Sequence, residues 1–202
     1  MKKSEITRGK ILKAAEDEFA EKGLYGARMD KIKESAGVNK RMLYAHFTNK
    51  ETLYATILSI VYDRMSAMEE TLLQNQKPPL EFIEELICKY FDFLHDNPSY
   101  VKLIMWENLN EAKYLSQSQA HSNRNRGFFL TKKILEQGIA EKVFKPNIDI
   151  AEITLSLNMF CFSYFSNIHT MSYLMDVDYN KPSELQKRRQ YIVNLILESV
   201  KI

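Results

Sequence analysis

The 202-residue chain has few of the residues that bend or end helices, because it contains only 6 glycines and 5 prolines. So few turn-forming residues indicate a mostly helical chain with few tight turns. No alternating strand pattern, internal repeat or low-complexity segment stands out in the sequence. The composition therefore predicts an all-α protein.

Cysteine is equally scarce. Cys88 and Cys161 stand alone in apolar contexts and have no CxxC spacing. Isolated cysteines of this kind are small hydrophobes in most proteins, and neither has a nearby basic cluster to lower its thiol pKa. We expect both to be buried, reduced thiols in a reducing compartment, rather than a redox switch.

Long apolar runs are missing too. No segment approaches the roughly 20 apolar residues that a membrane-spanning helix needs. Lys2 and Lys3 are followed by polar residues, where a signal peptide would have an apolar segment. These observations predict a cytoplasmic protein.

The motifs of the common enzyme classes are also absent. The sequence has no HExxH, GxSxG, P-loop or GxGxxG motif. Its histidines are scattered, with no pair at helical spacing: His46, His95, His121 and His169. We therefore expect no catalytic residue, no metal ligand and no cofactor. A membrane-surface protein, the other alternative, is disfavoured by the acidic EDEFAE segment of the N-terminal helix.

Charge is unevenly distributed along the chain. Residues 1–55 hold 12 basic and 8 acidic side chains, a balance of +4, and the rest of the chain holds 16 and 18, a balance of −2. A basic N-terminal quarter is a hint of an anionic partner such as nucleic acid or a membrane surface. Charge alone is equally compatible with a solvated surface that has no partner.

Hydrophobic periodicity and capping residues predict the helices. In the first helix, Ile11, Leu12, Ala15 and Phe19 form one apolar stripe, and Gly23 follows in the position of a left-handed C-cap. Thr48 or Asn49 can cap the long fourth helix. Pro78 and Pro79 then mark a boundary. The expected helices cover 5–22, 28–35, 39–46, about 50–73, 80–96, about 98–110, a helix that starts within 111–125 and ends at Pro146, 150–175 and 183–201.

The third helix has an apolar foot and an unusual outer face. Leu43 and Phe47 point inward together, whereas Arg41 and Ala45 lie on the opposite side. Two short helices joined by the tight AGV turn match a helix-turn-helix, whose second helix can enter a major groove. The remaining polar and flanking positions are Asn39, Lys40, Met42, Tyr44 and His46.

These residue types suit DNA. Ala45 is small enough to let the helix approach base edges, and Arg41 can grip a guanine with two hydrogen bonds. Lys40, Tyr44 and Lys50 are donors suited to phosphates. Helix pairs with this spacing also occur in other all-α proteins, and a charged face that is only solvated remains an alternative.

The first 60 or so residues resemble the DNA-binding domain of the TetR family of transcriptional regulators. The resemblance is carried by Phe19 with Gly23, Ala36–Val38, Leu43–Phe47 and Lys50–Leu53, all at the family's spacing. It implies that Tyr44 and Lys50 contact phosphates. It also implies that a set of residues faces the groove: Asn39, Lys40, Arg41, Ala45 and His46.

Two positions depart from the family pattern. Met29, with Arg28 beside it, stands where the family often has a phosphate-binding hydroxyl, so Arg28 is the candidate for that contact. Arg41 stands where the family often has glycine. Its long side chain leads to the hypothesis that Arg41 reads a guanine.

The resemblance implies three parts: a DNA-binding domain over 1–50, a connecting helix over 51–76, and a ligand-binding and dimerisation domain over 77–202. The C-terminal part has no motif of comparable strength, although its ILEQGIAEKVF and NIDIAEIT segments loosely match such regulators. The last two predicted helices are the expected dimer surface, with Leu155, Met159, Phe162, Ile192, Leu195 and Ile196 as its apolar residues.

A helical lobe rich in methionine and aromatic side chains can hold an apolar cavity with a few polar anchors. The ligand-binding candidates are Tyr90, Phe93, Met105, Trp106, Phe128, Phe129, Phe160 and Tyr164, with Glu107, Asn108 and His169 as anchors. Core packing is the alternative for each of them.

Together these features predict a homodimeric transcriptional regulator that binds double-stranded DNA. Repression, with release from a palindromic operator when a small molecule binds, is the commoner family outcome. Activation and ligand-independent DNA binding are the alternatives.

Overall fold

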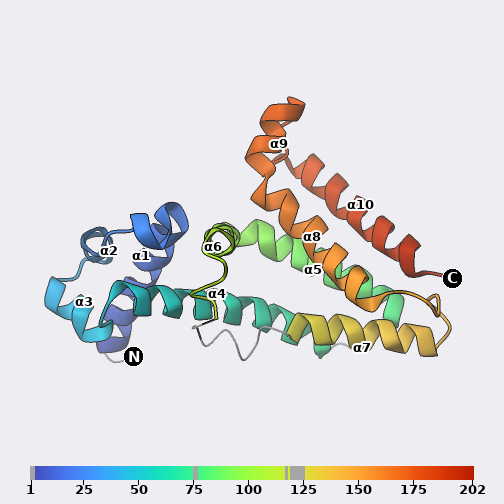
Figure 1. Ribbon diagram of the computed structural model, residues 1–202, viewed down its shortest axis with the longest axis horizontal. Coiled ribbons are helices and arrows are strands. Elements are labelled where there is room, and N and C mark those ends of the chain that lie inside the picture. The colour runs from blue at the N-terminus through green and yellow to red at the C-terminus, as the bar shows by residue number, and fades with distance from the viewer. Residues whose placement is uncertain (1–2, 75–76, 117, 119–125) are drawn as a thin grey trace. The chain divides into compact units, whose positions relative to one another are not determined.

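The computed structural model describes residues 3–74, 77–116, 118 and 126–202, and every regular element in these ranges is a helix (Figure 1). This confirms the all-α prediction. The described residues also contain one isolated antiparallel β-bridge, between Phe144 and Lys201. The helices are α1 Lys3–Gly26, α2 Met29–Ala36, α3 Lys40–His46, α4 Lys50–Leu73, α5 Pro79–Asp96, α6 Pro98–Leu109, α7 Arg126–Ala140, α8 Ile150–Ser166, α9 Ile168–Met175 and α10 Pro182–Val200.

The chain divides into two compact units. The first contains the described parts of 1–64 and 99–124, and the second contains the described parts of 65–98 and 125–202. Helix α4 therefore contributes residues to both, and nearly all of α6 belongs with the N-terminal helices. The predicted domain ranges 1–50, 51–76 and 77–202 divide the chain at other positions than these units do. Those domain ranges stay a prediction.

Helix α1 buries its predicted stripe, because Ile11, Ala15 and Phe19 are all fully buried. Gly23 interrupts the helix, as its position predicted, but with φ 64° and ψ 179° rather than a left-handed helical ψ, and one more turn follows to Gly26. A Cβ at Gly23 would lie 2.7 Å from the ring of Trp106. The indole Nε1–H of Trp106 also donates a hydrogen bond to the carbonyl of Ala20, at 3.3 Å. Glycine is thus required here both for its backbone angle and for space.

The two short helices and the start of α4 are defined by their caps. Gly37 ends α2 in the left-handed conformation, and its N–H donates to the carbonyl of Glu34. Asn39 caps α3 by accepting a hydrogen bond from the Met42 N–H at 2.8 Å. Asn49, one of the two predicted candidates, caps α4 by accepting from the Thr52 N–H at 2.7 Å.

The core of the second unit is formed by α5, α7, α8 and α10, which pack on one another (Figure 1). Arg189 on α10 donates from Nη1 to both carboxylate oxygens of Asp92 on α5, at 2.7 and 2.9 Å. Cys161 is buried in this unit, and burial raises its pKa to about 12, while Cys88 is half-buried. Both thiols are free.

Two predicted helix boundaries in this unit are wrong. The helix expected over 150–175 is broken at Asn167 into α8 and α9, whose separate caps the apolar composition does not reveal. Helix α7 ends at Ala140 instead of running to Pro146, because the chain turns through Lys142 at φ 58° and packs Phe144 against Gly138. Part of the polar stretch 111–125, namely 117 and 119–125, lies outside the described residues.

Gly23→Ala should destabilise the first unit by about 2 kcal/mol or more, because alanine is strained at positive φ and its Cβ would strike Trp106. Gly9→Ala is the matched control, since nothing lies within 4 Å of a Cβ there, and it should stabilise by up to about 1 kcal/mol. Urea unfolding followed by the fluorescence of Trp106, the one tryptophan, measures both. Equal midpoints for the two variants would contradict this account.

Candidate nucleic-acid interface

Helix α3 presents the face that the sequence predicted. Leu43 and Phe47 are 1% and 4% exposed, so they anchor the helix, and the Arg8 guanidinium lies over the Phe47 ring at 5.6 Å. The opposite residues, Arg41 and Ala45, are exposed. On the flanks and first turn, Asn39, Lys40, Met42 and Tyr44 are exposed and His46 is half-buried.

The basic residues of this face are free to meet an anion. No carboxylate of the described residues lies within ion-pair distance of Lys40 or Arg41. The Lys40 ammonium lies 5.9 Å from the centre of the Tyr44 ring, so these two predicted phosphate donors share one patch. On α2, by contrast, Lys31 and Lys33 pair with acidic residues of their own helix. Of the two helices α2 and α3, it is therefore α3 that carries unpaired positive charge.

Asn39 has a structural role besides its predicted contact. Its side-chain oxygen is used by the N-cap bond, which leaves the amide N–H groups to donate outward. A seven-residue helix depends strongly on such a cap, since short helices are marginal by themselves. Reading and capping can thus be performed by different atoms of the same side chain.

Lys50 bonds to the backbone that directly precedes Arg28, the residue before the start of α2. The Lys50 Nζ donates to the carbonyls of Ala27, at 3.1 Å, and Tyr25, at 3.5 Å. Arg28 follows Ala27 directly and is exposed, and its backbone N–H donates to Glu18 Oε1 at 3.0 Å. Both predicted phosphate contacts thus lie beside the positive end of the α2 dipole, where an anion is favoured.

A partly buried ion pair holds α1, α4 and α6 of this unit together. Arg64 on α4 donates from both terminal nitrogens to the Glu16 carboxylate, at 2.9 and 3.1 Å, and the Ser99 hydroxyl donates to the same carboxylate. Burial raises the pKa of Glu16, but the hydrogen bonds from Arg64 and Ser99 outweigh it and hold the pKa below its usual value. Sequence reasoning missed this triad, whose members are up to 83 positions apart.

Glu107, one of the proposed ligand anchors, serves the backbone instead. It is 2% exposed, and its Oε2 accepts from the N–H groups of Tyr114, at 3.1 Å, and Leu115, at 2.8 Å. The Tyr114 ring packs edge-on against Tyr54, and its hydroxyl lies 3.2 Å from that of Tyr25. Burial and the nearby Glu107 raise the pKa of Tyr54. These contacts attach the segment after α6 to α1 and α4 of the first unit.

The eight ligand-binding candidates are not gathered in one site. Met105 and Trp106 belong to the first unit, and the other six belong to the second. Tyr90 and Phe93 are buried, Phe160 is half-buried, and Phe128 and Phe129 are 42% and 61% exposed. Their role in ligand binding stays a prediction.

One of the eight, Tyr164, lines a cavity of about 370 Å³ at the junction of α8, α9 and α10. Ser163, Asn167, Ile168, Met171, Tyr179 and Arg188 line it as well. No signal in the sequence indicates Arg188 or Tyr179, because their approach to Tyr164 depends on the break between α8 and α9.

The described ranges contain neither a candidate metal site nor a candidate membrane-spanning helix. No group of three or more His, Cys, Asp or Glu side chains there could hold a metal ion. No helix there is both long and apolar enough to cross a membrane.

Two consecutive parts of the chain match known protein families. Residues 11–57 match the family described as "Bacterial regulatory proteins, tetR family". Residues 79–196 match the family described as "Tetracyclin repressor-like, C-terminal domain". The two matches fall on either side of the break at Pro78.

Individual relatives are named transcriptional regulators as well. The HTH-type transcriptional repressor NicS of Pseudomonas putida is 31% identical over 173 residues, covering 85% of this chain and 82% of that protein. The structure of the ketosteroid transcriptional regulator KstR2 of Mycobacterium tuberculosis matches with a TM-score of 0.74 at 21% identity, over 96% of this chain and 95% of that one. A TetR transcriptional regulator from Chloroflexus aurantiacus matches over the full length of both chains, with a TM-score of 0.75 at 14% identity. The two structural likenesses concern the fold.

The geometry of α3 predicts different outcomes for its two basic residues. Arg41→Ala should relax base preference at one position of each half-site, with about 1–3 kcal/mol of discrimination lost. Lys40→Ala should weaken binding to all sequences alike and lower the salt slope by about 1. Fluorescence anisotropy on the preferred site and its single-base variants, over a range of salt, measures both effects.

The control is Lys132→Ala, which removes one positive charge from α7 in the second unit and should change neither quantity. Arg41→Ala protein that keeps its full base preference would exclude a direct reading role for Arg41.

Proposed function

Since this chain belongs to the TetR family of DNA-binding transcriptional regulators, we propose that it is a repressor that binds a palindromic operator as a homodimer and leaves it when a small molecule binds the second unit. The observation that carries the proposal is the α3 face, where exposed Lys40 and Arg41 have no acidic partner among the described residues. A bacterial regulator of this kind would act in the cytoplasm, where its DNA lies.

Repression is supported by the names of two relatives. NicS is named a transcriptional repressor, and the KstR2 protein of Mycobacterium tuberculosis, 27% identical over 143 residues, is named one too. A repressor needs only to occupy a promoter, so the interface described above is sufficient for it. Activation would need a further surface that contacts the transcription machinery.

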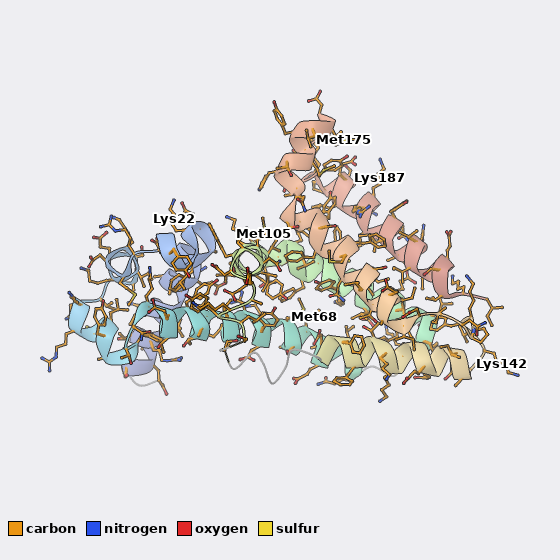
Figure 2. All side chains as sticks on the ribbon, in the orientation of Figure 1. Lys22, Met68, Met105, Lys142, Met175 and Lys187 are labelled. Atoms are coloured by element: carbon orange, nitrogen blue, oxygen red, sulfur yellow. The ribbon has the colours of Figure 1, made fainter. Side chains whose placement is uncertain are left out.

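A homodimer is supported by exposed apolar side chains. One head makes few base contacts, and two-fold dimers that read two half-sites are the usual way to gain affinity and specificity. On α9 only Ile168 is buried, and Met175 lies at the exposed end of the helix (Figure 2). Exposed apolar residues of this region are Leu155, Met159, Met171, Tyr173, Leu174, Met175, Val177 and Tyr191.

The expected dimer residues need one correction. Ile192 and Ile196 are 0% and 2% exposed, because they pack into the core of their own unit. Leu155 and Met159 are each 54% exposed, which keeps them as candidates for a second copy to cover. A helix face this apolar is more typical of an interface than of a solvated surface.

Ligand release would operate by population shift. A ligand that binds better to one spacing of the two heads moves the equilibrium by its difference in affinity. Helix α4 is the candidate lever, since it is continuous from Lys50 to Leu73 and contributes to both units. The bound state would move the heads away from the spacing of about 34 Å that successive major grooves require.

The test of the proposed function is a selection of bound sites from random duplex DNA with the purified full chain. We expect a palindrome whose half-sites lie about one helical turn, or a multiple of it, apart. A Lys40→Ala/Arg41→Ala double variant is the control and should enrich nothing. Absence of any enriched site, or a single unpaired half-site, would contradict the proposal. A reporter placed behind the selected site then separates repression from activation.

Met159→Glu should dissociate the dimer, with a dissociation constant at least about tenfold higher, because a charge would be buried at the interface. Leu109→Glu is the control, because Leu109 is 76% exposed at the end of α6, outside the proposed surface. Sedimentation velocity over a concentration series measures both variants. A monomeric wild-type protein, or equal dissociation of the two variants, would argue against this dimer surface.

A further inference from the structure

The cavity at the junction of α8, α9 and α10 has chemistry that packing alone does not explain. It measures about 370 Å³, the scale of a site for a small organic molecule. Its walls combine apolar side chains, Ile168 and Met171, with the phenol rings of Tyr164 and Tyr179 and the guanidinium of Arg188. All of these residues belong to the second unit.

Arg188 lacks the acceptor that its position calls for. Its Nε is buried and has no hydrogen-bond partner, and its Nη2 makes one long bond of 3.4 Å to the carbonyl of Phe160. No carboxylate among the described residues lies within ion-pair distance of it. The adjacent Arg189 shows the contrast, because it is paired with Asp92 at 2.7 Å. A buried donor without an acceptor is destabilising, which makes Arg188 the unexplained group of this unit.

The guanidinium is also held in place before any ligand arrives. It lies between two rings, 5.9 Å from the centre of Tyr164 and 5.6 Å from that of Tyr191. Tyr164 is itself fixed, since its hydroxyl donates to the carbonyl of Tyr179 at 2.7 Å. The Tyr179 N–H in turn donates to the Ser172 hydroxyl at 3.2 Å. A planar donor fork kept in one orientation loses little freedom when it binds a planar acceptor.

The surroundings restrict the charge of such an acceptor. Burial, followed by the negative charge of Glu184, raises the pKa of Tyr164 to about 12, and the positive charge of Arg188 opposes this rise. Arg188 is the one charged residue among those that line the cavity in the described part of the chain. A ligand with a single negative charge therefore balances the charge of this site.

We propose that this cavity binds a small organic monocarboxylate, with the carboxylate on the Arg188 guanidinium and the hydrocarbon part against Ile168, Met171 and the tyrosine rings. The two terminal nitrogens of Arg188 can each donate an N–H to one oxygen of a carboxylate. An aromatic or short acyl body fits the apolar walls and the volume. The inference deepens the proposed function by naming a ligand class, and rests on it only for the release of DNA.

The experiment is calorimetric titration of the full-length protein with benzoate, 3-phenylpropanoate and octanoate. Benzamide and 3-phenylpropanamide serve as uncharged controls of the same shape. We expect saturable binding of at least one carboxylate at or below about millimolar concentration, and at least about tenfold weaker binding of its amide. Arg188→Gln and Arg188→Lys should each lose about tenfold, since lysine keeps the charge but not the fork.

Lys187→Gln is the matched control, because it removes a positive charge one residue away on the exposed side of α10 (Figure 2). It should bind the carboxylate within about twofold of the wild type. The circular dichroism spectrum and thermal midpoint of each variant show whether it is folded.

Three results would overturn the inference: no saturable binding of any of the three acids, equal affinity for acid and amide, or unchanged affinity in folded Arg188→Gln protein. DNA release is measured separately, by anisotropy on the selected operator. Carboxylate binding that leaves the operator complex intact would refute ligand release by this site while leaving the binding site itself established. Loss of carboxylate binding in the Arg188 variants, together with intact operator recognition, supports both the carboxylate site and the proposed DNA binding.

Discussion

The reading surface depends on how little of α3 is anchored. The helix has seven residues, too few to be stable alone, and it is held by two buried side chains, Leu43 and Phe47, together with the Asn39 cap. Because the anchor takes only one narrow face, the rest of the helix is left outward and unpaired. Arg41 and Lys40 can then carry recognition without any cost to the core, which is why an unusual residue such as Arg41 is tolerated there.

The head that carries α3 includes more than the N-terminal helices. Trp106 occupies the space left by Gly23, and the Ser99 hydroxyl joins the Glu16–Arg64 pair, so α6 is part of the same compact unit. Glu107 then fixes the backbone at Tyr114 and Leu115. Contacts between residues far apart in sequence thereby hold the end of α1 in place, and α2 and α3 follow from it.

Local signals in the sequence were sufficient to predict much of the N-terminal architecture. Glycine at 23 and 37, and asparagine at 39 and 49, act through their own backbone or within three residues, so the helix-turn-helix and the outward face of α3 could be predicted. Tertiary partners could not. The attachment of Trp106 to α1, the use of Glu107 by the backbone and the buried, unpartnered Nε of Arg188 all depend on contacts between distant segments. The break at Asn167 was missed because α8 and α9 are equally apolar.

If the outward face of α3 lies in the major groove, methylation interference on the selected operator will show it. Guanine N7 lies in the major groove and adenine N3 in the minor groove. We expect N7 methylation to block binding at guanines in two clusters, one in each half-site, and N3 methylation within the same clusters to have little effect. Interference confined to adenine N3, or N7 methylation without effect, would contradict it.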